Sequence, residues 1–349
     1  MANARWKRRP EGSTWGDWGP DDQLGRLNLL TPEKVKEGIA EVREGITFCL
    51  SLPLDYPGGT ALNPRRHPPV LRPTLRNERT NYLYRLADDD PELIDVINDD
   101  AAIIHLQYSS QWDSLAHVGQ LFDADDDGTA EAVFYNGFRA GEDIVGPSDV
   151  ADAGAVGEFR AKATCHAHKL GIENLAEKCI QGRAVMIDLL AHFGPGRRLV
   201  GYDDVMQVVD KDRVAVNPGD MVCLHTGCAQ RVLDMRKQPS KGEAEDVPAL
   251  DGRDDRLLQW ISDSGIVALI GDNHAVEAQP PRAATGVRAQ LPLHAHCLFK
   301  VGVILGEYWH LTPLAQWLRS NGRSAFLLTA PALRLPGAVG SPPAPIATV

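Results

Sequence analysis

The chain has 349 residues, 43% of them hydrophobic and 24% charged, with a formal net charge of −11. This composition is typical of a soluble globular protein large enough for a sizeable core. The acidic balance argues against nucleic acid and against an anionic membrane surface as partners. The sequence has no apolar stretch long enough to span a bilayer and no signal peptide, so we expect a cytoplasmic protein. Six scattered cysteines without a C-x-x-C pair indicate reduced thiols, as in the cytoplasm.

The first third of the chain alternates irregular segments with short ordered elements. Residues 1–30 are rich in Trp, Gly, Pro and charge, which predicts an irregular N-terminal arm. Thr31 before Pro32 predicts a helix that runs to about Glu44 and stops at Gly45. A strand over 46–52 follows, and then a long loop over 55–77 with many Pro and Gly residues.

The rest of the chain alternates strand and helix signals. Continuous apolar runs predict strands buried on both faces at 101–107, 184–190, 221–226 and 266–271. The expected helices cover 170–180, 202–209, 253–264, 292–302 and 313–321, and a last strand covers 324–332. The Pro- and Gly-rich tail over 336–349 is expected to be extended. This alternation predicts an α/β fold, and no repeat, linker or composition shift divides residues 1–349 into more than one domain.

Polar residues gather between positions 107 and 117. Gln107, Gln111 and Asp113 would share one face of a strand that ran this far, and His117 follows Asp113 by one helical turn. An amide oxygen is a weak ligand for metals of the zinc type. The residue types alone therefore favour a polar strand end, with Trp112 in the core, over a metal site.

The same segment resembles the H-x-G-T-H-x-D-x-x-x-H motif of the cyclase family that includes kynurenine formamidase and isatin hydrolase. Asp113 and His117 match its Asp and last His, whereas Gln107 and Gln111 stand where its two metal-binding histidines fall. Other segments similar to the family are 15–16, 22–32, 134–137, 171–173, 182–188, 218–220, 225–227, 272–277 and 335–342. The resemblance implies one cyclase-like α/β domain of the swivelling β/β/α kind, with a mixed central sheet and flanking helices.

The resemblance also supplies a second half of the site. His294 in Pro292-Leu293-His294 and Glu307 in Gly306-Glu307 resemble the family's P-x-H and G-E blocks, which complete a two-metal centre. It implies that Asp113, Gln107 and Gln111 are the metal-site residues and that the catalytic residues are His117, His294 and Glu307.

Three further residues are candidates for substrate contacts. His274 follows a predicted buried strand, in the kind of loop that often faces ligands in α/β sheets. Trp112 and Tyr135 are compatible with an aromatic ligand, although core packing explains them equally well.

The resemblance leaves the chemistry open between three hypotheses. The first is a hydrolase of an amide, lactam or lactone of a small molecule, with a divalent metal, Mn²⁺, Zn²⁺ or Mg²⁺. The second is a metal-independent cyclase, lyase or dehydratase on an aromatic or polyketide-like molecule, in which carboxylates and histidines do acid–base chemistry directly. The third is an inactive binding protein on the same fold. In each case we expect a small-molecule ligand and a homo-oligomer, a dimer or a tetramer.

Overall fold

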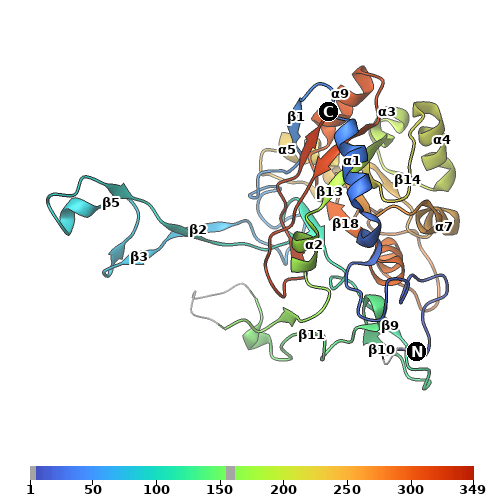
Figure 1. Ribbon diagram of the computed structural model, residues 1–349, viewed down its shortest axis with the longest axis horizontal. Helices are drawn as coiled ribbons and strands as arrows, with labels where there is room; N and C mark the ends of the chain where they lie inside the picture. Colours follow the sequence, from blue (N-terminus) through green and yellow to red (C-terminus); the bar gives the residue numbers. More distant parts are fainter. Residues whose placement is uncertain (1–4, 155–161) are drawn as a thin grey trace.

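The computed structural model describes residues 5–154 and 162–349, and Figure 1 labels many of their elements. In this part of the chain, nine strands form one mixed sheet in the order β1-β21-β19-β13-β15-β17-β18-β8-β20. The strands are β1 Thr47–Cys49, β8 Gln111–Asp113, β13 Gln181–Asp188, β15 Met221–His225, β17 Ala268–Gly271, β18 Ile304–Glu307, β19 Ala325–Thr329, β20 Gly340–Ser341 and β21 Ile346–Thr348. The predicted α/β fold with a mixed central sheet is confirmed.

The middle of the sheet is parallel and buried on both faces. Strands β13, β15, β17 and β18 pair in parallel, and nearly every residue in them is buried. Both faces are covered, which is why these strands read as continuous apolar runs. Three of the predicted buried strands, 184–190, 221–226 and 266–271, are found here. Antiparallel strands flank this centre on both sides, and β8 pairs with β18.

Helices cover the sheet. They are α1 Pro32–Ala40, α2 Glu173–Lys178, α3 Leu189–Phe193, α4 Tyr202–Asp212, α5 Cys228–Asp234, α6 Lys241–Ala244, α7 Asp255–Ser264, α8 Pro292–His294 and α9 Thr312–Ser320. The 3-10 turns are η1 Gly25–Leu29, η2 Leu86–Asp88, η3 Tyr135–Gly137 and η4 Val150–Asp152, and η5 Ala295–Val301 is a π-helix. The predicted start of the first helix at Pro32 is confirmed, but the helix ends at Ala40 rather than near Glu44. The helix expected over 292–302 is α8 followed by η5.

A long two-stranded arm between residues 68 and 106 corrects two predictions. Strands β2 Val70–Pro73 and β7 Asp100–Ile103 pair with each other, followed outward by β3 Leu75–Arg76, β4 Arg79–Thr80, β5 Tyr84–Arg85 and β6 Val96–Ile97. Figure 1 shows this arm projecting from the body of the protein. The apolar run at 101–107 is therefore not a buried strand of the central sheet, because β7 pairs locally and alternates exposed and half-buried residues. The predicted loop over 55–77 ends where β2 begins.

The C-terminal tail is part of the sheet. Strand β21 lies between β1 and β19, and β20 pairs with β8 at the opposite edge. Ala347 and Val349 are fully buried. The tail is extended, as expected, and its two short strands pair with strands at opposite sides of the central sheet.

Three smaller two-stranded sheets complete the described part. They are β9 Gln120–Phe122 with β10 Glu131–Val133, β11 Ile144–Val145 with β12 His166–Ala167, and β14 Arg198–Val200 with β16 Pro248–Leu250. The six cysteines, all in described segments, are unpaired; three are buried and three are exposed. Among the described residues, no helix combines the length and the apolar character needed to cross a membrane.

Candidate active site and metal centre

The register of β8 against β18 places three polar side chains on one face of the sheet. Gln111 lies directly opposite Glu307, and Asp113 lies opposite Leu305. Opposed residues of an antiparallel pair share a face, and so do alternate residues of one strand. Gln111, Asp113 and Glu307 therefore point to the same side, and all three are buried.

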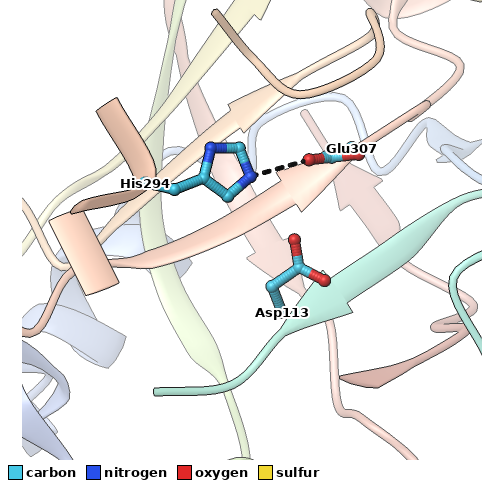
Figure 2. A group of neighbouring side chains, drawn as sticks. All are labelled: Asp113, His294 and Glu307. Carbon is cyan, nitrogen blue, oxygen red and sulfur yellow. Dashed lines mark hydrogen bonds and ion pairs between the residues drawn. The ribbon is translucent and has the colours of Figure 1, made fainter. Parts of the chain in front are cut away.

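His294 completes this group from a different element. It is the last residue of α8, and its Nε2 lies 3.2 Å from Oε1 of Glu307. One ligating atom each from Asp113, His294 and Glu307 lie within 4.8 Å of one another. Figure 2 shows the three side chains converging from β8, α8 and β18. Three segments that are distant in sequence thus form one buried cluster that could hold a metal ion.

Glu277 fixes the orientation of His294. Its Oε1 accepts a hydrogen bond from Nδ1 of His294 at 2.8 Å and one from the His294 backbone N–H at 3.2 Å. Its Oε2 accepts from the backbone N–H of Leu293 at 3.1 Å. A carboxylate behind a histidine sets which ring nitrogen faces the site. Glu277 was not predicted as a site residue, although it closes the segment 272–277 that is similar to the family and follows a buried strand.

The Gln111 amide joins the two carboxylates. Its Nε2 lies 3.0 Å from Oε2 of Glu307, and 3.3 and 3.5 Å from the two carboxylate oxygens of Asp113. Its Oε1 is buried and accepts no hydrogen bond from any described residue. Gln111 therefore belongs to the cluster, as predicted from its motif position, but presents a donor to it rather than an oxygen.

Gln107 lies in a turn before β8 and not on the strand, so the expected strand face is wrong at this end. A Cβ placed on Gly340 would lie 2.4 Å from Nε2 of Gln107. Gly340 pairs with Asp113, so the Gln107 amide lies on the same face of the sheet as Asp113. Within the described segments, no hydrogen bond joins the Gln107 side chain to Asp113, His294 or Glu307. The structure thus places Gln107 beside the cluster rather than in it.

His117 and a small pocket lie near the cluster. The Nε2 of His117 lies 3.7 Å from Oδ1 of Asp113, and the His117 side chain is 20% exposed. The pocket is lined by Arg66, Tyr108, His274, Tyr308 and residues of the loop over 57–63. The rings of His274 and Tyr308 lie 5.7 Å apart. A partly exposed histidine next to a buried carboxylate can exchange protons between the cluster and solvent.

The charges in the cluster are strongly coupled. Burial raises the pKa of Asp113, and the nearby charge of Glu307 raises it further against the opposing effect of His117. Burial alone would raise the pKa of Glu307, but the hydrogen bond from His294 and the nearby positive charges together outweigh burial and lower that pKa to about 2. Burial alone would lower the pKa of His294, but hydrogen bonds to Glu277 and Glu307 raise it to about 10. Without an added ion, the His294 imidazolium balances the Glu307 carboxylate, while Asp113 holds a proton more readily than usual.

Two predicted substrate contacts lie elsewhere. Trp112 points to the opposite face of β8, where it is fully buried against Trp309 and its indole N–H donates to the carbonyl of Ala330 at 2.8 Å. Tyr135 is also fully buried, and its hydroxyl contacts Thr14 of the N-terminal arm. Trp112 is separated from the cluster by the strand itself. Both aromatic residues are packing residues, whereas His274 does line the pocket.

The residues present fit a divalent cation. The cluster offers two carboxylates and one imidazole, a donor set that binds divalent metals. The Oε1 of Gln111 is buried without a hydrogen-bond partner among the described residues, so it is a further oxygen that could bind the ion. A set dominated by oxygen suits Mn²⁺ or Mg²⁺, while Zn²⁺ prefers nitrogen and sulfur.

Comparison with known proteins identifies the family. The model of the Cyclase family, described as “Putative cyclase”, matches residues 50–278, more than half of the chain. The protein therefore belongs to the Cyclase family. The chain has no match among curated protein sequences.

Solved structures agree with this assignment. A crystal structure described as a novel cyclase is 28% identical, with 97% of each chain covered and a TM-score of 0.71. Isatin hydrolase A from Ralstonia solanacearum is 14% identical, with 91% of this chain and 97% of that chain covered and a TM-score of 0.51. An isatin hydrolase bound to the product analogue thioisatinate is 12% identical, with 91% and 99% covered and a TM-score of 0.52. The two isatin hydrolases share the fold with this chain.

Proposed function

We propose that the protein hydrolyses an amide, lactam or lactone bond of a small molecule, with a divalent metal held by Asp113, His294 and Glu307. The observation that carries this proposal is the convergence of these three buried side chains within 4.8 Å of one another. Buried carboxylates need a cation or hydrogen bonds, and a cluster of this kind beside a pocket is a functional-site signature. Two proteins that share the fold are isatin hydrolases, and a hydrolytic reaction is in keeping with this likeness.

Each side chain has a place in this reaction. When bound, the metal would polarise the substrate carbonyl and lower the pKa of a water molecule. His117, at the boundary between the cluster and solvent, takes the proton of the attacking water and returns it to the leaving group. Glu277 holds His294 with Nε2 directed at the centre. His274 and Tyr308 form the wall on which the substrate packs, with the positive charge of Arg66 at its edge.

A second candidate is acid–base chemistry without a metal. It is favoured by the position of the Gln111 amide, which already bridges the Asp113 and Glu307 carboxylates. The pKa of Asp113 is raised and the pKa of Glu307 is lowered, so the two groups are separated into an acid and a base. Such a pair would serve a cyclase, lyase or dehydratase.

The two candidates differ in their response to chelation. Turnover of isatin, formanilide and dihydrocoumarin would be measured with protein treated with EDTA and then supplied with MnCl₂, MgCl₂ or ZnCl₂. We expect hydrolysis of at least one of the three, loss of activity in EDTA and recovery with the ion. Activity that survives EDTA would exclude the metal-dependent reaction in favour of the second candidate.

The variant His117→Gln tests the role of the proton carrier. We expect its turnover to fall about 10²- to 10⁴-fold, the usual contribution of a general base. If neither His117→Gln nor Asp113→Asn changed the turnover of a substrate, the cluster would not be the catalytic site. If the wild type turned over none of the three substrates yet bound them, the protein would be a binding protein on this fold.

A further inference from the structure

We propose that Gln111 is a reversible metal ligand, which donates its amide N–H to the carboxylates in the empty centre and supplies its Oε1 to the ion in the filled centre. The consequence is an oxygen-rich site for Mn²⁺ or Mg²⁺. At such a site Zn²⁺ exceeds these ions in affinity by less than it does at a site with more imidazole ligands. This inference rests on the proposed metal-dependent function and adds the class of ion and the residue that selects it.

The position of Gln111 is the first support. It lies opposite Glu307 in the ladder, two residues before Asp113, and it is fully buried. Its Nε2 contacts an oxygen of Glu307 at 3.0 Å and one of Asp113 at 3.3 Å. A positively polarised N–H group thus occupies the place between two carboxylates, where a cation would neutralise both. The amide stabilises the centre in the absence of an ion.

The unpaired oxygen is the second, independent support. The Gln111 Oε1 is buried and has no hydrogen-bond partner in the segments that the structure describes. A buried acceptor without a partner is costly and needs an explanation. The nitrogen and oxygen of a glutamine amide have nearly the same size, and the last side-chain torsion is soft, so half a turn exchanges them without moving the backbone.

This exchange is coupled to the ion by charge. With no cation present, turning Oε1 toward the carboxylates would set three oxygen acceptors against one another, so the amide presents Nε2. With a cation present, Nε2 would be repelled, and Oε1 becomes favourable. The backbone does not need to follow, because the Gln111 carbonyl is held by the indole N–H of Trp309 at 3.1 Å.

The resulting donor set decides which ion is favoured. It consists of three oxygens, from Asp113, Glu307 and Gln111, and one nitrogen from His294. Oxygen donors suit Mn²⁺ and Mg²⁺, whereas imidazole suits Zn²⁺. An imidazole at position 111 would shift the set toward zinc, so glutamine at this position lowers the ratio of Zn²⁺ to Mn²⁺ affinity.

Calorimetric titration of the metal-free protein tests this. Protein freed of metal with EDTA and then dialysed would be titrated separately with MnCl₂ and ZnCl₂, and bound Mn²⁺ would be counted by electron paramagnetic resonance. We expect Gln111→Leu to weaken Mn²⁺ binding at least about tenfold, and Gln111→His to raise the ratio of Zn²⁺ to Mn²⁺ affinity at least about tenfold.

A glutamine elsewhere in the same sheet provides the control. Gln181 starts β13 and donates to the Thr329 hydroxyl, away from the cluster. Gln181→Leu is expected to leave both affinities within about twofold of wild type, as is usual for distant sites. Wild-type Mn²⁺ affinity in Gln111→Leu would overturn the inference and leave the proposed function standing. If Gln111→Leu does not fold, an unchanged affinity ratio in Gln111→His overturns it. Wild-type protein that binds neither ion would overturn both.

Discussion

Glu277 shows how a residue outside the ligand group can control it. It receives three hydrogen bonds from Leu293 and His294, two of them from backbone N–H groups at the start of α8. The carboxylate therefore positions the short helix and the imidazole together. A residue that acts through a ligand in this way is a positioning residue, and its loss affects the metal before it affects the fold.

The variant Glu277→Gln tests this role. The substitution keeps the size of the side chain, but it replaces one carboxylate oxygen by an NH₂ group. This group would face the N–H groups of Leu293 and His294, which are hydrogen-bond donors themselves. We expect its affinity for Mn²⁺, measured by calorimetry, to fall about 10- to 100-fold. Glu177→Gln is the control, because Glu177 is an exposed partner of Arg334 on the surface. Equal affinities in Glu277→Gln and wild type would show that Glu277 supports only the backbone.

At the scale of elements, successive side chains of β8 lie in two different environments, the polar cluster and the hydrophobic core. Gln111 and Asp113 face the cluster, while Trp112 between them packs against Trp309 in the core. The short strand thus holds both the site and part of the core, because successive side chains point to opposite faces. A shift of its register by one residue would exchange the two environments.

The projecting arm differs from the rest of the molecule, because many of its apolar side chains are exposed. Leu75 is 75% exposed and Ile94 is 92% exposed. Two-stranded ribbons are marginally stable alone, and exposed apolar groups on them commonly mark a contact surface. The homo-oligomer expected from the sequence stays a prediction, and the arm is the segment with which to test it.

We expect Leu75→Ser and Ile94→Ser, made in one double variant, to change little in the monomer. Each substitution should change the free energy of unfolding by less than about 0.5 kcal/mol, as at other exposed positions. Urea unfolding at two protein concentrations, followed by circular dichroism, measures this. A loss of stability that grows with dilution, or a change of mass in light scattering, would show instead that another copy of the chain covers these side chains.

At the scale of the whole molecule, a second buried charge pair joins two neighbouring strands in the middle of the sheet. Nδ1 of His225 lies 2.7 Å from Oδ1 of Asp188, and the two residues are opposed in β15 and β13. Burial alone would lower the pKa of His225, but the hydrogen bond that it donates to Asp188 and the charge of Asp272 raise it above its ordinary value. Burial alone would raise the pKa of Asp188, but the hydrogen bond from His225 and the charge of His225 lower it.

These shifts predict how stability depends on pH. Because the pKa of His225 is raised in the folded state, it adds to the free energy of unfolding. This contribution is fully present below about pH 6.5 and is lost as the pH rises through the pKa of the folded state. The lowered pKa of Asp188 gives stability that is complete above about 3.9 and is lost as the pH falls through the folded value. The pair therefore contributes most between these limits.

Asp188→Asn measures this contribution. The variant should cost about 3–5 kcal/mol near pH 5.5, as is typical when one partner of a buried pair is removed. The cost should shrink at pH 9, where wild-type His225 loses more of its proton. Asp188 also caps α3, but an asparagine can cap too, and that effect is the same at both pH values. Urea unfolding at the two pH values gives the comparison, and an equal cost at both would contradict the shift of His225.

The sequence by itself determined the fold class, and it pointed to three residues whose side chains the structure brings together. The parallel strands are readable because burial on both faces makes each a continuous apolar run, and Thr31-Pro32 marks the first helix by local chemistry. Asp113, His294 and Glu307 are identifiable by their resemblance to the family, although spacing alone would not join them. The prediction of a buried strand at 101–107 was wrong, because a locally paired ribbon and a buried strand have similar composition.

Only the tertiary structure decided how these residues meet. The register of β8 on β18 set Gln111 opposite Glu307, and a long-range register of this kind leaves no local pattern in the chain. The contact of Glu277 with His294 and the unpaired Gln111 oxygen depend on side-chain positions that packing fixes. The same packing sent Trp112 and Tyr135 into the core and brought the tail into the sheet. Burial and hydrogen bonding between distant segments therefore defined the centre, because neither is a property of any one segment.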